Sequence, residues 1–128
     1  MNESINESKG VVYAVLGGSE GDHVFDEIYM FTSNHNKAMK VSREEIDNGD
    51  FEYTFVEEVP CDINLNRFVA TVVGYSEKEK GYVKVISVHN KEKDANEFIK
   101  NMSEEDKALY KKQYDVDSYE VELTIFEK

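Results

Sequence analysis

VVYAVLG, residues 11–17, returns 57 positions later as FVATVVG, residues 68–74. The first stretch is rich in β-branched residues and carries apolar side chains at every position before its glycine, not only at alternate ones. Such a pattern is typical of a strand that is covered on both faces. The stretch therefore predicts a central strand, and its return predicts a second one.

Each copy is followed by the same order of predicted elements. Turn residues and hydrophobic periodicity after the first copy predict a glycine-rich turn at 17–22, a strand at 24–32, a helix at 37–47 and a strand at 51–59. From Arg67 the same signals predict strands at 67–75, 82–89 and 119–126, with helices at 94–101 and 104–114. Each half is thus predicted to be a ββαβ unit, and the second has an extra helix that Ser103 is suited to cap.

The two halves also match residue by residue. Aligned without a gap, residues 11–43 and 68–100 share six identities in 33 positions, among them Gly17 with Gly74. The third strands are aligned at an offset of 68 residues, which pairs Phe51 with Tyr119. Self-similarity of this kind indicates an internal duplication. Two unrelated ββαβ units would share part of the pattern for physical reasons alone.

We therefore predict an α+β fold of two tandem ββαβ units, each an antiparallel sheet with its helices on one face. A right-handed crossover should place the third strand of each unit beside the first. A three-stranded sheet with one helix is small, so the units should either share a core or continue one another's sheet about a pseudo-twofold axis. The predicted organisation is a polar arm at 1–9, an acidic unit at 10–59, a linker at 60–66 that holds the only proline, and a second unit at 67–128.

Cysteine content and the N-terminal segment bear on the compartment. Cys61 is the only cysteine, so no intramolecular disulfide can form, as is usual in a reducing cytosol. The segment MNESINESK has neither the basic nor the apolar region of a secretory signal. No apolar run approaches the roughly 20 residues needed to cross a bilayer. We expect a cytoplasmic protein that does not enter the membrane.

The pattern VYAVLG, an acidic turn, EIYMFTS and a helix containing Ala38 resembles small domains of unknown function that are common in phages and low-GC Gram-positive bacteria. The resemblance covers about 33 residues of each half. It implies no known reaction and no site residues. It favours an accessory protein of a phage or mobile element, acting in the host cytoplasm.

No residue pattern points to catalysis, a cofactor or a metal ion. The histidines, His23, His35 and His89, have no other ligand residue at a metal-binding interval. The glycine-rich turn at 17–22 is followed by a strand, whereas a phosphate-binding loop would open a helix. Carboxylates are so frequent that no acid–base pair can be singled out. We predict a protein that is not an enzyme and uses no cofactor.

Charge is the most distinctive feature. The net charge of −12 is uneven, because residues 1–66 hold 4 basic and 14 acidic side chains whereas residues 67–128 hold 11 and 13. No Lys or Arg lies between Arg43 and Arg67. The carboxylates in this interval are predicted to form a partner-binding surface, and they are Glu44, Glu45, Asp47, Asp50, Glu52, Glu57, Glu58 and Asp62.

An acidic surface suits a basic protein, because complementary potentials speed association. It disfavours direct binding of nucleic acid, since phosphates are bound by cations. We predict an inhibitor or adaptor that occupies a basic, nucleic-acid-binding surface of a host protein, for example a nucleic-acid-processing enzyme, in the manner of anti-defence or anti-CRISPR proteins. Acidity that serves only solubility is an alternative explanation.

A second hypothesis belongs to another class. A cleft between the two units could hold a small, nucleotide-like molecule, so that the chain would act as a sensor or sponge. The hairpin tips at 17–22 and 74–81 would then form the rims. Open sheet edges would also allow the chain to form a homodimer.

Overall fold

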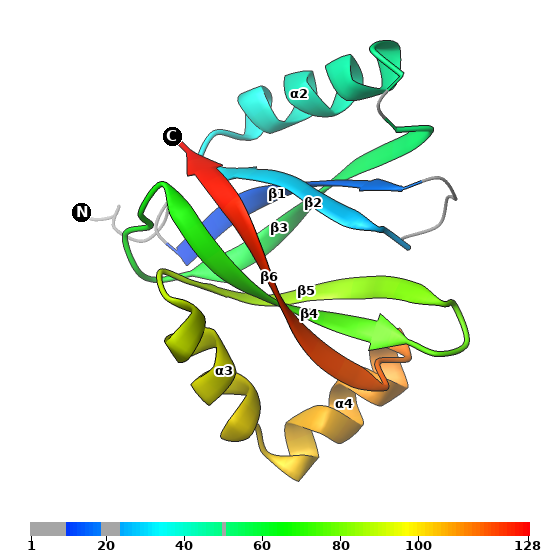
Figure 1. The fold of residues 1–128 in the computed structure, drawn as a ribbon, viewed down its shortest axis with the longest axis vertical. Helices are drawn as coiled ribbons and strands as arrows, with labels where there is room; N and C mark the ends of the chain where they lie inside the picture. The colour runs from blue at the N-terminus through cyan, green and yellow to red at the C-terminus, as the bar shows by residue number, and fades with distance from the viewer. Residues whose placement is uncertain (1–9, 19–23, 50) are drawn as a thin grey trace, which may run out of the picture.

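The computed structural model describes residues 10–18, 24–49 and 51–128. The fold is mixed α+β, and its six described strands form one sheet in the order β3-β1-β2-β6-β4-β5. The predicted arm at 1–9 and most of the predicted hairpin tip at 17–22 lie outside the described residues. Figure 1 shows the strands in two crossed groups with helices on either side.

The first group, called the first sheet, is built around β1 (Gly10–Gly18). This strand pairs antiparallel with β2 (Glu27–Thr32) on one side and β3 (Tyr53–Cys61) on the other. The predicted order of second, first and third strand is confirmed. Helix α2 (His35–Asp47) begins where the Asn34 side chain accepts a hydrogen bond from Lys37 N at 3.0 Å.

The second sheet has the same order around β4 (Phe68–Ser76). This strand pairs antiparallel with β5 (Gly81–His89) and β6 (Ser118–Glu127). Two helices, α3 (Glu92–Lys100) and α4 (Glu104–Tyr114), connect β5 to β6. Ser103 caps α4 as predicted, because its hydroxyl accepts a hydrogen bond from Asp106 N at 3.0 Å.

A common core lies between the two sheets. Buried side chains from both sheets form one cluster, including Val12, Leu16, Phe31, Val73 and Val85. The sheets join where β2 runs parallel to β6, through Phe31 opposite Phe126 and Thr32 opposite Glu127. The sheet is curled, so its outermost strands also meet: Val85 N on β5 donates a hydrogen bond to the Glu57 carboxylate on β3 at 3.0 Å. The expected shared core is confirmed.

The helices cover the outer sides of the two sheets. Ala38 on α2 packs with Val15 and Met30 on the outside of the first sheet. Ala95 on α3 and Tyr110 on α4 belong to the cluster on the outside of the second sheet. The helices therefore flank the two sheets from opposite sides (Figure 1).

Several predicted boundaries differ from the structure by one to three residues. Strand β3 continues through Pro60 and Cys61 into the predicted linker, where they lie opposite Val11 and Gly10. Proline is tolerated here because β3 is hydrogen-bonded to a strand on one side only in the described ladder. Helix α2 begins at His35, two residues before the predicted start at 37, and its Ser42 hydroxyl lies 2.7 Å from that of Thr54 on β3.

The predicted alignment of the third strands is wrong by three residues. Val15 lies opposite Val56 in the first sheet, and the matching Val72 lies opposite Val121 in the second, which gives an offset of 65 and not 68. An odd shift moves every side chain to the other face of a strand. Phe51 and Tyr119 are both aromatic, but they do not occupy the same place relative to the central strand, and only the strand partner reveals that place.

Candidate functional site

The acidic residues of α2 divide between surface and interior. Glu44 and Asp47 are exposed, whereas Glu45 is only 7% exposed. This division follows from helical spacing, because Ala38, Ser42 and Glu45 lie on the face that packs against the sheet. The helix also carries Lys37, Lys40 and Arg43, which precede its acidic end.

The acidic residues on and around β3 point in different directions. Glu57 lies between the sheets, where its carboxylate accepts the hydrogen bond from Val85 N and lies 3.8 Å from Lys84 Nζ. Glu58, the next residue, is exposed on the other face. Glu52 and Asp62, at either end of the strand, are exposed. Asp50 lies outside the described residues.

The structure therefore leaves only part of the predicted acidic set exposed. The exposed members along the α2 and β3 side of the first unit are Glu44, Asp47, Glu52, Glu58 and Asp62. We call this set the first-unit acidic surface. Sequence reasoning could not separate it from Glu45 and Glu57, because the choice depends on which face each element buries.

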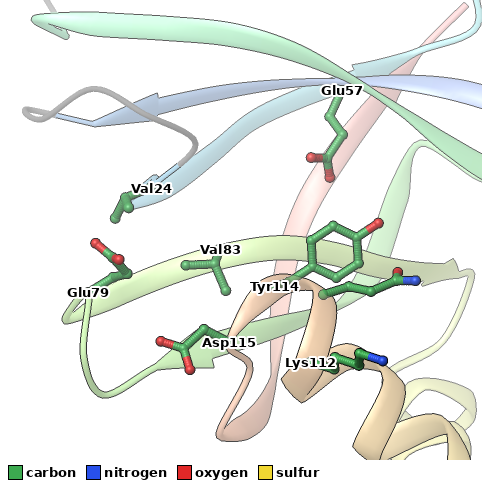
Figure 2. A pocket seen from close by; sticks show the side chains of 8 residues that line it. Val24, Glu57, Glu79, Val83, Lys112, Tyr114 and Asp115 are labelled. Atoms are coloured by element: carbon green, nitrogen blue, oxygen red, sulfur yellow. The ribbon is translucent and has the colours of Figure 1, made fainter.

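A cavity of about 490 Å³ lies between the two units (Figure 2). Val24 and Glu57 come from the first unit, and the other lining residues, including Glu79, Val83 and Tyr114, come from the second. Lys84 Nζ lies 4.9 Å from the centre of the Tyr114 ring. Glu79 belongs to the hairpin tip at 74–81 that was predicted as a rim. The lining carries carboxylates as well as Lys112 and so offers no uniform charge.

A second opening lies between β2 and β6. The two strands pair only at their C-terminal ends, and residues 26–29 and 122–125 line a cavity of about 490 Å³. Thr124 bridges part of it, because its hydroxyl donates a hydrogen bond to Ile28 O at 3.1 Å. Asp26, Glu27 and Glu122 give this cavity an acidic lining.

Beside this opening, Tyr82 lies between two carboxylates of β6. Its hydroxyl lies 2.7 Å from Glu122 Oε2 and 3.0 Å from Glu120 Oε1. Burial, followed by these two hydrogen bonds, raises the pKa of the Tyr82 phenol above its usual value. Sequence reasoning missed this cluster. The alternation of Glu120 and Glu122 with apolar residues signals one polar face of β6, but it does not say which face lies inward.

The apolar face of β6 is exposed at one position. Tyr119 and Val121 pack against the cluster under α3 and α4, and Ile125 packs against the cluster under α2. Leu123, between them, is 68% exposed. Phe68 on the adjacent strand is exposed to the same extent. Both side chains, together with Ile125, line a further cavity of about 470 Å³.

Metal binding and nucleophilic chemistry find little support in the described part of the chain. No three His, Cys, Asp or Glu side chains among residues 10–18, 24–49 and 51–128 are grouped so as to hold a metal ion. Cys61 is partly buried, and its thiol donates a hydrogen bond to Ile63 O at 3.3 Å. None of the helices in the described ranges is long and apolar enough to cross a membrane.

Comparison with family models, with curated proteins and with solved structures finds no match to this chain. Any functional assignment therefore has to come from the geometry of its own residues.

Proposed function

We propose that this protein is a non-enzymatic binding protein that captures a basic partner through the first-unit acidic surface. The observation that supports the proposal is that five carboxylates between residues 44 and 62 remain exposed after folding, in an interval without any Lys or Arg. Complementary charge would steer a basic partner to this surface and make association sensitive to salt.

The kind of partner follows from the same chemistry. A protein surface that binds nucleic acid is basic, because it must displace the counterions of the phosphates. An acidic protein can occupy such a surface and compete with the nucleic acid. We propose that the partner is a host nucleic-acid-processing protein. We also propose that a phage or mobile element encodes this chain, as the resemblance of its opening pattern to small phage domains favours.

Charge reversal tests the proposal. A variant with Glu44→Lys, Asp47→Lys, Glu52→Lys and Glu58→Lys should lose a basic host protein that the wild type captures from lysate at low salt. Glu45 and Glu57 are left unchanged because their burial would make a lysine costly to accommodate. The matched control reverses four exposed acids of the second unit, Glu77, Glu97, Glu104 and Glu105. Equal loss from both variants, or no salt-sensitive capture by the wild type, would contradict the proposal.

The cavity between the units supports a second candidate function. A space of about 490 Å³ lined from both units is large enough for a small ligand. A nucleotide panel should then raise the melting temperature of the wild type, and Tyr114→Ala should reduce the shift. No shift with any member of the panel would argue against this candidate.

We also infer that the chain arose by duplication of one ββαβ unit. The β-bulge between Val15 and Leu16 in the first hairpin recurs between the matching Val72 and Val73 in the second. The junction of β2 with β6 and the contact of β5 with β3 join matching pairs of strands, as a pseudo-twofold axis would require.

A further inference from the structure

We propose that the open edge of β6 docks an extended, basic segment of a partner protein as an added strand. The segment alternates apolar residues with Lys or Arg. This surface is separate from the first-unit acidic surface, and the proposal does not depend on the function assigned to that surface.

The backbone of β6 offers an edge for pairing at residues 118–123, because from Thr124 onward the strand is already linked to β2 through the hydrogen bond to Ile28 O. Residues 118–125 pair with β4 on one side, whereas on the other side the ladder with β2 includes only residues 126 and 127 within the described part of the chain. Unpaired N–H and C=O groups along a strand edge are a template for another strand. Recognition by strand addition uses such an edge for affinity and neighbouring side chains for specificity.

Like charges help to explain why this edge stays open. On the other side of the fold, Lys84 on β5 lies 3.8 Å from Glu57 on β3. In the alignment given by the strand registers, the matching residues across β2 and β6 are Glu27 and Glu122. Two carboxylates cannot form the ion pair that links β5 to β3. A cation from outside the chain would relieve their repulsion.

The side chains around the edge determine the chemistry of the occupant. Two adjoining cavities share Leu123, Thr124 and Ile125, and we call them together the β6 groove. One cavity is apolar at Phe68 and Leu123, and the other is acidic at Asp26, Glu27 and Glu122. Of the described residues that line the two cavities, none is Lys or Arg. The groove therefore complements a positively charged segment with apolar anchors.

Strand periodicity sets the order of those residues. Successive side chains of β6 point to opposite faces, so Leu123 lies on the outer face and Glu122 on the inner face near Tyr82. A strand added beside β6 alternates in the same way. Its apolar residues would meet Leu123, and its basic residues would meet the carboxylates.

The test uses a short, capped peptide of alternating valine and lysine with a fluorescent label, added to the full-length protein at physiological ionic strength. Binding is followed by anisotropy, and the site is mapped from amide NMR shifts. We expect the largest shifts at residues 26–29 and 120–125. Leu123→Ser and Glu27→Lys should each weaken binding by about tenfold, the loss typical of a well-placed contact at an interface.

Matched controls separate the groove from general charge. Leu109→Ser removes an exposed leucine of α4, and Glu105→Lys reverses an exposed charge of the same helix. Both should leave the affinity within about twofold, because neither side chain lines the groove and distant exposed charges are screened at this ionic strength. A peptide of the same composition with its lysines in one block should bind at least several-fold more weakly. No binding of the alternating peptide, equal binding of both peptides, or equal loss from Glu105→Lys and Glu27→Lys would overturn the proposal.

Discussion

Phe25 and Tyr82 donate backbone hydrogen bonds to each other, from Phe25 N to Tyr82 O at 2.9 Å and from Tyr82 N to Phe25 O at 3.2 Å. Their rings also lie 5.6 Å apart, centre to centre. The two residues are 57 positions apart and therefore occupy matching places in the two units. A reciprocal contact between matching residues is what the proposed duplication about a pseudo-twofold axis predicts. This pair is a direct contact between the first unit and the second.

Truncation of Phe25 should weaken the whole fold. The side chain is fully buried between the sheets, so Phe25→Ala removes its contacts and leaves a cavity. We expect a loss of about 3–5 kcal/mol in the free energy of unfolding, measured by urea denaturation. Phe68→Ala is the matched control, because Phe68 is largely exposed and should cost far less. Similar losses for the two variants would contradict the position of Phe25 in the core.

The glycines shared by the two copies have a common packing role. A Cβ on Gly17 would lie 2.6 Å from the Phe51 ring, and a Cβ on Gly74 would lie 2.6 Å from a methyl group of Val116. Phe51 and Val116 each precede the third strand of their unit by two residues. We expect Gly74→Ala to destabilise the fold by about 1–3 kcal/mol through overpacking.

A second substitution checks the cause. In the double variant Gly74→Ala with Val116→Ala, the new methyl group has room, so part of the loss should be recovered relative to the sum of the two single variants. Thermal or urea unfolding of the three variants gives this coupling. Strict additivity would show that the clash with Val116 is not the cause.

Removal of the Thr71 hydroxyl should stabilise the fold. The residue is fully buried, and its Oγ1 has no hydrogen-bond partner among the described residues. Thr71→Val keeps the shape and removes a buried polar atom, so we expect a gain of about 1 kcal/mol in the free energy of unfolding. Thr54→Val is the control and should lower the free energy of unfolding, since the Thr54 hydroxyl donates a hydrogen bond to Ser42 O at 2.8 Å. A loss of stability in Thr71→Val would point to an internal water or other partner.

His89 should make stability depend on pH. Burial lowers the pKa of its imidazole below the ordinary value of 6.5, although the charge of Asp94 acts in the opposite direction. The unfolded chain therefore binds a proton at a higher pH than the folded chain does. The neutral ring contributes fully to the free energy of unfolding above pH 6.5, the ordinary pKa. This contribution is lost as the pH falls from there through the lower pKa of the folded state.

NMR titration of the ring measures this directly, and the His89 signals should show a midpoint below 6.5. The free energy of unfolding should fall between pH 7 and the folded-state pKa, and His89→Gln should reduce that dependence. A midpoint at or above the ordinary value would show that the ring is better solvated than its contacts with Ser87 and Phe98 indicate.

Much of the local structure could be predicted from sequence. Each described strand and helix was expected, because periodicity, turn residues and caps such as Asn34 and Ser103 act over a few neighbouring positions. The candidate site was predicted less well. Glu45 is buried and Glu57 is turned between the sheets, since local sequence does not say which partner an element will meet.

The sequence by itself determined the order of strands and helices in each half and the central place of VVYAVLG and FVATVVG in their sheets. It also determined the concentration of acidic residues in the first half. Only the tertiary structure decided that Phe25 meets Tyr82, that the third strands match at an offset of 65, and that β6 turns Glu120 and Glu122 toward Tyr82 and Leu123 to the opposite face. The physical reason is that a strand alternates between two faces with a period of two, and only contact with distant strands selects the face that is buried.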